Sequence, residues 1–355
     1  MLITNTLTQI EKGSTKMLDV RFVLQIIELL KSEPNGQWRR MVKSNKTTVR
    51  FCDILWIGAH NAGTDKLHFH HEFDIFYSTD GNTKNVLCSI SQRYGHIPVV
   101  RQMTSYVTMN QIHNISTLLN LGVRFFDMDI CIDRDTRELA ICHCLFGESL
   151  SLTLNYFKQW LWQNPDEFLT LTFKDGIINA NIYYSLVTKI YIHLRSFLIE
   201  KRELYTDLNI LSKRNHRVFL SIHGDEYMTG KYFQWVIKYS FITRGKYSNF
   251  HYADEVMLDQ KKQMLSSYSD NTFNILHAYR QPNSLNVFKT HIGILAFNYK
   301  FFNNLNPIYP TAQNELNEEF YDIWVSEEWN EMRSKINVIL LNHIGRNTME
   351  LFLRN

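Results

Sequence analysis

Long apolar runs are missing from this sequence of 355 residues. No stretch approaches the roughly 18 consecutive apolar residues that a membrane-spanning helix needs. The first residues also lack the basic start, apolar core and small-residue cleavage site that mark a secretory signal peptide. We therefore expect a cytoplasmic protein, or one that binds a membrane only at its surface.

Cysteine is scarce and is not arranged for zinc. The five cysteines cannot all pair with one another, and none of them lies in a CxxC motif. A reducing compartment is the simpler interpretation of this usage. Cys142 and Cys144 flank His143, but at this spacing we expect them to pack rather than to bind a metal.

An excess of charge of one sign is also missing. The sequence has 38 Lys and Arg against 35 Asp and Glu, so a net charge of +3 gives no whole-chain signal for binding nucleic acid. With 45% hydrophobic and 21% charged residues, the composition is that of an ordinary globular protein. Aromatic residues are abundant at 14%, which suits a large core or a surface that meets lipid or sugar.

Short apolar runs alternate with helical patterns along most of the chain. We assign residues 1–50 to a helical lead-in, with an amphipathic helix that begins near Ser14 and stops before Pro34. Helical patterns are predicted at residues 111–120, 152–163 and 183–211. Strands are predicted at residues 54–58, 123–130, 139–142, 168–173, 218–222, 273–277, 292–297 and 338–341. About eight strands interleaved with helices predict an α/β fold, a (β/α)8 TIM-type barrel with some irregularity, as a single domain over residues 51–355.

Two carboxylates lie on one face of the predicted strand at 123–130. Side chains alternate along a strand, so Asp127 and Asp129 point the same way from an otherwise apolar segment. Buried carboxylates repel each other and are rarely left without a cation or a proton. The turn sequence DRDTRE follows, and the next apolar run ends on His143. This combination indicates a functional site rather than a core.

Polar residues follow several of the predicted strands. In barrels of this kind the chemistry gathers at the carboxyl ends of the strands. A single histidine at a strand end is more often structural. Here polar residues follow each of the first four predicted strands, which favours a functional site. The residues concerned are His60, Asn61, Asp127, Asp129, His143, Lys174, His223, Asn342 and His343.

Four segments carry a resemblance to a known family. They are WIGAHNAGTD, QIHNISTLLNLGVRFFDMDI, ELAICHCLFG and WLWQNPDEFLTLTFKD, between residues 56 and 175. Their order and spacing resemble the X-type catalytic domain of phosphatidylinositol-specific phospholipases C, in its stand-alone form. INVILLNH near the end resembles the last strand of that family, although an Asp is more usual where Asn342 lies.

The resemblance implies a phosphodiesterase with two catalytic histidines, His60 and His143. In the family mechanism an inositol hydroxyl of the substrate attacks phosphorus and a cyclic phosphate forms. One histidine activates that hydroxyl or stabilises the phosphorus intermediate, and the other protonates the leaving alcohol. Imidazole suits both tasks because it titrates near neutral pH. We expect both histidines to be needed for turnover and not for folding.

The resemblance leaves metal dependence open. Asn61, Asp127 and Asp129 match the calcium ligands of the eukaryotic branch, and hard oxygen ligands suit Ca²⁺. Lys174 departs from that branch, which has a glutamate there, and matches metal-independent bacterial relatives. Those relatives tend to have Asp beside the first histidine and Arg at the position of Asp129. We predict weak Ca²⁺ binding. The alternatives for Lys174 are that it replaces the ion by pairing with Asp129, that it reaches the phosphate, or that it faces solvent.

Other residues are given smaller roles. His223 and Tyr279, together with Lys174, are predicted to bind the substrate headgroup, and Arg124 is expected in a structural ion pair. Residues 231–252 are basic and aromatic, which predicts contact with a membrane surface; a barrel helix that buries its aromatic side chains is the alternative.

Three classes of function remain open at this point. The first is cleavage of an inositol phospholipid, and the second is cleavage of a glycerophosphodiester on the same barrel. The third is a catalytically weak module that binds phospholipid headgroups. The expected partners are a phospholipid or small phosphodiester substrate and, transiently, a membrane surface, but no nucleic acid.

Overall fold

The computed structural model describes the end of the predicted lead-in and much of the α/β domain. The described residues are 37–43, 47–67, 108–133, 136–143, 145–174, 179–224, 227, 233–238, 248, 252–267, 273–279 and 308–353. The chain divides into the units Met1–Gly36 and Gln37–Asn355, and all described residues fall in the second unit. The predicted helix before Pro34 and the predicted strand at 292–297 lie outside the described residues, and the domain boundary at residue 50 stays a prediction.

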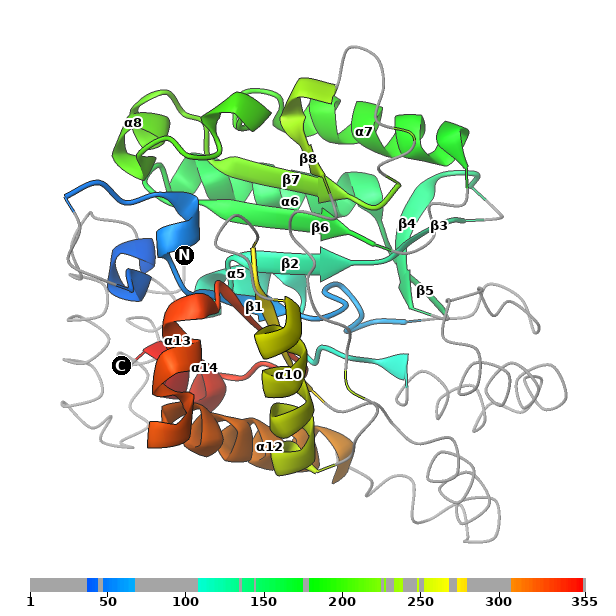
Figure 1. Cartoon of the computed structure of the whole chain (residues 1–355). Coiled ribbons are helices and arrows are strands. Elements are labelled where there is room, and N and C mark those ends of the chain that lie inside the picture. The colour runs from blue at the N-terminus through cyan, green and yellow to red at the C-terminus, as the bar shows by residue number, and fades with distance from the viewer. Residues whose placement is uncertain are drawn as a thin grey trace, which may run out of the picture. The chain divides into compact units, whose positions relative to one another are not determined.

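The main sheet has seven strands, and every neighbouring pair in it is parallel (Figure 1). Parallel sheets are covered on both faces, which explains why these strands are almost continuously apolar. In spatial order the strands are β8 (Val236–Lys238), β7 (Val218–Ile222), β6 (Leu169–Phe173), β2 (Phe125–Met128), β1 (Trp56–Ala59), β10 (Val338–Leu341) and β9 (Ile275–Ala278).

Helices alternate with these strands along the chain. They are α5 (Ile115–Leu121), α6 (Leu150–Gln163), α7 (Ala180–Leu194), α8 (Leu208–Lys213), α10 (Ala253–Ser267), α12 (Ile308–Val325), α13 (Asn330–Lys335) and α14 (Arg346–Leu353). Four of them begin at a polar residue whose side chain accepts a backbone N–H of the first turn: Asn114, Ser149, Asn179 and Asp207. None of the described helices is both long and apolar enough to cross a bilayer.

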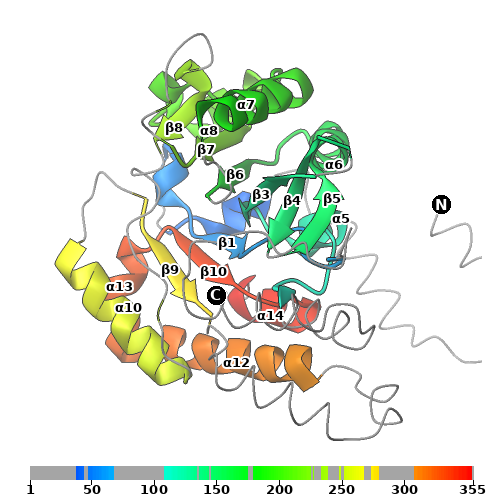
Figure 2. The ribbon, with the colours of Figure 1, turned by 90° about the vertical axis from the view of Figure 1, so that its right-hand side faces the viewer.

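The predicted α/β class is confirmed. The strand order is that of a parallel barrel in which the two end strands, β8 and β9, are not paired with each other among the described residues. Figure 2 looks onto the carboxyl ends of the strands, with a second, smaller sheet beside the main one.

The strand predicted at 139–142 was wrongly placed in the barrel. It forms β4 (Leu139–His143) of a three-stranded antiparallel sheet with β3 (Ile130–Ile132) and β5 (Leu145–Ser149). The six residues between β3 and β4 are too few, because a parallel crossover needs a dozen or more. The two ends of this connection lie together instead, because the Asp133 N–H donates to Glu138 O at 2.8 Å. His143 is therefore carried by a hairpin and not by a barrel strand.

Two further expectations are corrected. The helical pattern at 183–211 forms two helices, α7 and α8, with an extended segment around Leu198 that bridges to Val218. In the described part of residues 231–252, Phe233–Trp235 is a short 3-10 helix and Val236–Lys238 is strand β8 with Val236 and Ile237 buried, so the alternative of a barrel helix is wrong for these residues. Most of residues 231–252 lies outside the described ranges, so membrane contact there stays a prediction.

Aromatic side chains fill the amino-terminal end of the sheet. Phe51 stacks on Phe219 at 3.6 Å and on Phe273 at 4.4 Å between ring centroids, and packs against Trp56. These rings come from four separate segments and close the barrel interior at the end opposite to the predicted site. Apolar packing at this end stabilises the fold, whereas catalytic residues in such barrels gather at the carboxyl ends of the strands.

A buried ion pair lies close to the same end. Arg124, which precedes β2, donates its Nε–H to Glu167 Oε2 at 2.9 Å, and the two side chains are 3% and 9% exposed. The guanidinium also donates to the Leu119 and Val123 carbonyls and lies over the Trp160 ring. The prediction that Arg124 makes a structural ion pair is thus in agreement with this geometry.

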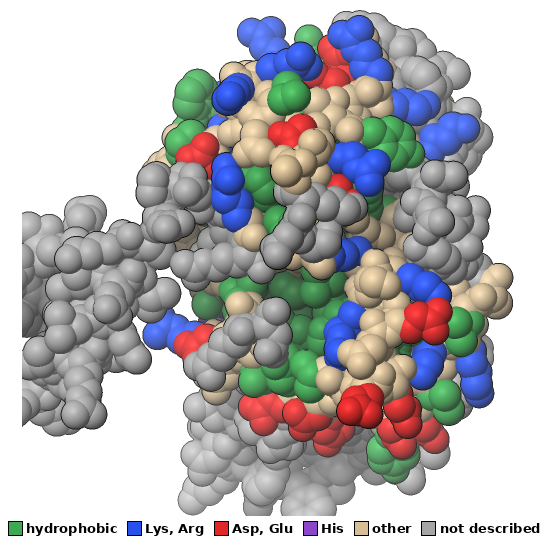
Figure 3. Space-filling view, turned by 60° about the vertical axis from the view of Figure 1, so that its left-hand side comes forward, with side chains coloured by type: hydrophobic (Ala, Val, Ile, Leu, Met, Phe, Trp, Pro, Cys, Tyr) green, Lys and Arg blue, Asp and Glu red, His purple; other side chains and the backbone are tan. Residues whose placement is uncertain are grey.

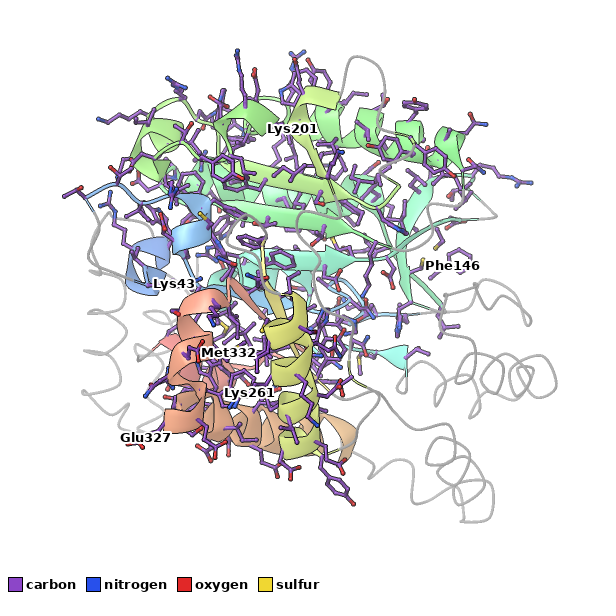
Figure 4. All side chains as sticks on the ribbon, viewed as in Figure 1. Lys43, Phe146, Lys201, Lys261, Glu327 and Met332 are labelled. Carbon is purple, nitrogen blue, oxygen red and sulfur yellow. The ribbon has the colours of Figure 1, made fainter. Side chains whose placement is uncertain are left out.

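A cavity of about 490 Å³ opens on the outer side of the amino end of β1. Its lining is mostly apolar and includes Leu55, Ile57, Trp324 and Phe352. Figure 3 shows hydrophobic side chains gathered in a hollow on this side of the molecule. In Figure 4, Lys43 of this lining and Phe146 of the hairpin lie at opposite ends of the sheet.

Candidate functional site

His60 lies directly after β1 and is held there by a buried backbone network. Its N–H donates to Leu341 O of β10 at 2.9 Å. The side-chain amide of Gln111 donates to both His60 O and Leu341 O, at 2.9 Å each. Asn61 then takes a left-handed conformation with φ 45°, which turns the chain away from the strand. The ends of β1 and β10 are therefore locked side by side.

The His60 imidazole has one nitrogen committed to a partner. Its Nδ1 lies 2.8 Å from Asn342 Oδ1, and both side chains are buried. An amide oxygen only accepts, so Nδ1 carries the hydrogen and Nε2 is left as the proton acceptor. Nε2 lies 4.0 Å from Asp127 Oδ2. The geometry presents the form of histidine that can act as a general base.

The surroundings of His60 keep it neutral. Burial is the main reason that the pKa of His60 lies well below its usual 6.5, and the Lys174 ammonium lowers it further. The hydrogen bond to Asn342 works in the opposite direction but is outweighed. At neutral pH the ring is therefore unprotonated and ready to accept a proton.

Lys174 follows β6 and reaches the same carboxylate. Its Nζ lies 2.9 Å from Asp127 Oδ2, the oxygen that also faces His60. The sequence argument named Asp129 as the partner of Lys174, and the structure pairs it with Asp127. The alternative of a solvent-facing lysine is wrong, because this side chain is only 20% exposed.

His143 reaches the site from the hairpin. Its Nδ1–H donates to Thr108 O at 2.6 Å, and the ring is half-buried. The hairpin packs tightly on the loop that follows His60: a Cβ on Gly147 would lie 3.0 Å from Gly63 O. His143 is close enough to His60 for its charge to lower the pKa of His60. The two histidines thus come from different sheets and meet at one site.

The structure brings the other predicted residues to the same end. His223 is exposed and donates its Nδ1–H to Lys174 O at 2.9 Å. Tyr279 is buried, with its ring stacked on His60. Asn61 and Asp129 are also buried, and Asn61 Oδ1 has no hydrogen-bond partner among the residues that the structure describes. Such an orphaned acceptor is costly unless a ligand donates to it.

Comparison with known proteins agrees with this geometry. A family model described as PI-PLC X 1 matches residues 91–204. The resemblance to this family is confirmed. The matched region includes Asp127, Asp129, His143 and Lys174, whereas His60 and Asn342 lie outside it. No curated protein matches the chain significantly.

Solved structures of phosphatidylinositol-specific phospholipases C share the fold. The enzyme from Listeria monocytogenes has a TM-score of 0.53 and 13% identity, over 90% of this chain and 98% of that chain. A Staphylococcus aureus enzyme has a TM-score of 0.53 and 11% identity, over 89% of this chain and 99% of that chain. At such low identity the likeness shows the fold alone.

The residues that the PI-PLC X resemblance assigns to calcium do not fit that ion well. Ca²⁺ takes about six to eight oxygen ligands. Asn61 Oδ1 is available, but Asp127 is already neutralised by the Lys174 ammonium at 2.9 Å. Within the described ranges no group of three or more His, Cys, Asp or Glu side chains is arranged to hold a metal. A lysine on the carboxylate competes directly with a cation.

Some residues that shape this candidate site were missed by sequence reasoning. Gln111 and Thr64 are fully buried, and Thr64 Oγ1 accepts from the Asn110 and Gln111 backbone N–H groups. His277 lies 3.0 Å from the Tyr279 hydroxyl. Gln111 and Thr64 lie in two of the four resembling segments, and His277 ends the strand predicted at 273–277. These positions were the available hints, but nothing local to each residue shows that it contacts the site.

Replacing Asn342 by Asp should move the pH dependence of the site. The carboxylate would accept the same hydrogen from His60 and add a negative charge, which raises the pKa of His60. The predicted role of His60 as a base requires the neutral ring, so on this prediction the acidic limb of the kcat/KM profile should move to higher pH. Asn342→Leu is the matched variant: it removes an interaction that raises the pKa of His60, so the limb should move to lower pH while turnover falls. Identical limbs in all three proteins would contradict the assignment of this limb to His60.

Proposed function

We propose that this protein cleaves the phosphodiester bond of an inositol phospholipid by general acid and base catalysis with two histidines. The observation that carries the proposal is the buried, neutral His60. Its Nδ1 is held by Asn342, and its Nε2 lies beside the Asp127–Lys174 pair. The match of residues 91–204 to the PI-PLC X family supports the same chemistry.

Each step follows from a named group. His60 Nε2 accepts the proton of an inositol ring hydroxyl, whose oxygen then forms a new bond to phosphorus. The bond from phosphorus to the lipid alcohol breaks, and His143 Nε2 donates a proton to the leaving oxygen. The products are a cyclic inositol phosphate and the free alcohol. The Lys174 ammonium stabilises the charge that builds on the phosphate oxygens.

A membrane surface is the place where this substrate would be met. One of the Staphylococcus aureus structures with the same fold concerns the modulation of that enzyme's membrane binding. By analogy of fold we propose that this protein also works transiently on a phospholipid surface. Its basic and aromatic segment at residues 231–252 is the predicted contact.

The decisive experiment is incubation with phosphatidylinositol vesicles and, separately, with glycerophosphoinositol, with the products identified by phosphorus NMR. A cyclic inositol phosphate from the vesicles supports the proposal. Direct hydrolysis of the glycerophosphodiester without a cyclic product would favour the second class of function. Vesicle binding without any product would favour a headgroup-binding module. His60→Ala serves as the inactive control in each case.

Changing Lys174 to Glu should make the protein dependent on calcium. We expect the wild-type protein to keep its activity in a chelator, because Lys174 already supplies the positive charge beside Asp127. Lys174→Glu should lose activity by about 10² to 10³ in chelator, the usual effect of removing one electrostatic stabiliser. The added carboxylate should also produce calcium binding that is detectable by calorimetry. Lys213→Glu, the same charge change at an exposed site on α8, is the control. Loss of wild-type activity in chelator would instead assign the site to a metal.

A further inference from the structure

The His60 ring lies flat against the ring of Tyr279. The ring centroids are 3.8 Å apart and the planes differ by 11°. The two residues are 4% and 2% exposed, so the contact is fully buried. One face of the Tyr279 ring is therefore covered by the imidazole, so that face is not open to a substrate headgroup.

Strand register places Tyr279 beside the other partner of His60. In the β9–β10 pair, Ala278 lies opposite Leu341. The next residues along the two strands are Tyr279 and Asn342, so neighbouring strands present the phenol and the amide at the same level. Asn342 meets the edge of the imidazole and Tyr279 meets its face.

Tyr279 is itself held by a second histidine. The Tyr279 hydroxyl lies within hydrogen-bond distance of His277 Nδ1, at 3.0 Å. His277 is on β9, and its backbone N–H donates to Gln260 Oε1 of α10 at 3.1 Å. The phenol hydroxyl is thus held by a histidine whose own backbone is bonded to α10.

Two contacts are needed to define the orientation of an imidazole. The χ2 torsion of a histidine, which rotates the ring about the Cβ–Cγ bond, has broad preferences. One hydrogen bond at the ring edge therefore leaves some freedom in the plane of the ring. The partner here is a neutral amide, and hydrogen bonds to neutral groups are weaker than those to carboxylates. An aromatic stack removes the remaining rotation. Misplacing a catalytic group by about 1 Å can cost about a hundredfold in rate.

We propose that Tyr279, anchored by His277, is a positioning residue that fixes the plane of the His60 imidazole. This inference rests on the proposed function, in which His60 is the base. Tyr279 then acts on turnover through His60, and not through the headgroup contact predicted from the sequence.

The test compares Tyr279→Leu, which loses the stack, with Tyr279→Phe, which keeps the stack and loses only the hydroxyl. Kinetics on phosphatidylinositol vesicles should show kcat reduced by about tenfold to a hundredfold in Tyr279→Leu, with KM changed less than about twofold. Tyr279→Phe keeps the stack but loses the anchor to His277, so its kcat should fall by less than that of Tyr279→Leu. Phe168→Leu, an equal loss of a buried ring at the amino end of β6, controls for general weakening of the core. In the His60→Ala background, Tyr279→Leu should cause no further loss.

Crystal structures of the same variants give a readout that does not need activity. The His60 ring should leave its present plane in Tyr279→Leu and keep it in Tyr279→Phe. If the wild-type protein fails to cleave phosphatidylinositol but the ring moves, the proposed function is wrong and the positioning role stands. An unmoved His60 ring in Tyr279→Leu overturns the positioning role. A rise in KM at constant kcat also overturns it, because that pattern indicates direct substrate contact.

Discussion

Alanine in place of either His60 or His143 should reduce turnover of phosphatidylinositol by about 10² to 10⁴, the usual loss when a general acid or base is removed. His60 presents a neutral Nε2 beside Asp127, and His143 approaches from the hairpin with its Nδ1–H bound to Thr108 O. The two roles are distinct, so neither histidine can replace the other. The measurement is kcat on vesicles for each variant at saturating substrate.

Folding controls accompany this prediction because the two histidines differ in burial. His143 is half-buried, so His143→Ala should keep the wild-type melting midpoint. His60 is buried and bonded to Asn342, so His60→Ala should also lose some stability. His60→Gln, whose amide can still donate a hydrogen bond, separates lost chemistry from lost packing. His193→Ala, near the end of α7, should leave turnover unchanged. Turnover close to wild type in either site variant would remove the two-histidine mechanism.

The largest loss of stability is expected from breaking the Arg124–Glu167 pair. Arg124→Met leaves the Glu167 carboxylate buried without its cation, which should cost about 3 to 5 kcal/mol of unfolding free energy. Chemical denaturation measures this loss directly. The catalytic constants of the folded protein should change little, because the pair lies toward the amino ends of the strands, opposite to the site.

A double substitution tests the cause of that loss. Arg124→Met combined with Glu167→Leu removes both charges, so the protein should regain part of the stability that Arg124→Met alone loses. Full recovery is not expected, since the guanidinium also bonds the Leu119 and Val123 carbonyls. A double variant less stable than Arg124→Met would show that packing against Trp160 matters more than charge. A single-variant loss under about 1 kcal/mol, the range of surface pairs, would contradict the prediction.

Strands and helices with strong periodic patterns could be predicted well. Residues 218–222 and 338–341 coincide with β7 and β10, and the helix at 152–163 differs from α6 by two residues. These segments are buried, so their apolar pattern is strong. Strand β8 was not predicted, because three residues inside a basic and aromatic segment carry too little pattern to distinguish a strand from a helix.

The hairpin shows a different kind of failure. The apolar run at 139–142 was correctly predicted as a strand and wrongly assigned to the barrel. Only the length of the connection to Ile132 separates the two alternatives, and that length excludes a parallel crossover. Here the sequence held the deciding information, and chain geometry was needed to interpret it.

The sequence by itself determined the residue types of the site and their places at strand ends. A strand that ends in a histidine must present it at the same edge as its parallel neighbours, whatever the rest of the fold does. Only the tertiary structure decided which of these groups touch. Lys174 pairs with Asp127, Asn342 holds His60, and Tyr279 covers the face of that imidazole. These contacts join residues 47 to 282 positions apart in the chain or lie across different strands, so strand register and not local sequence sets their distances.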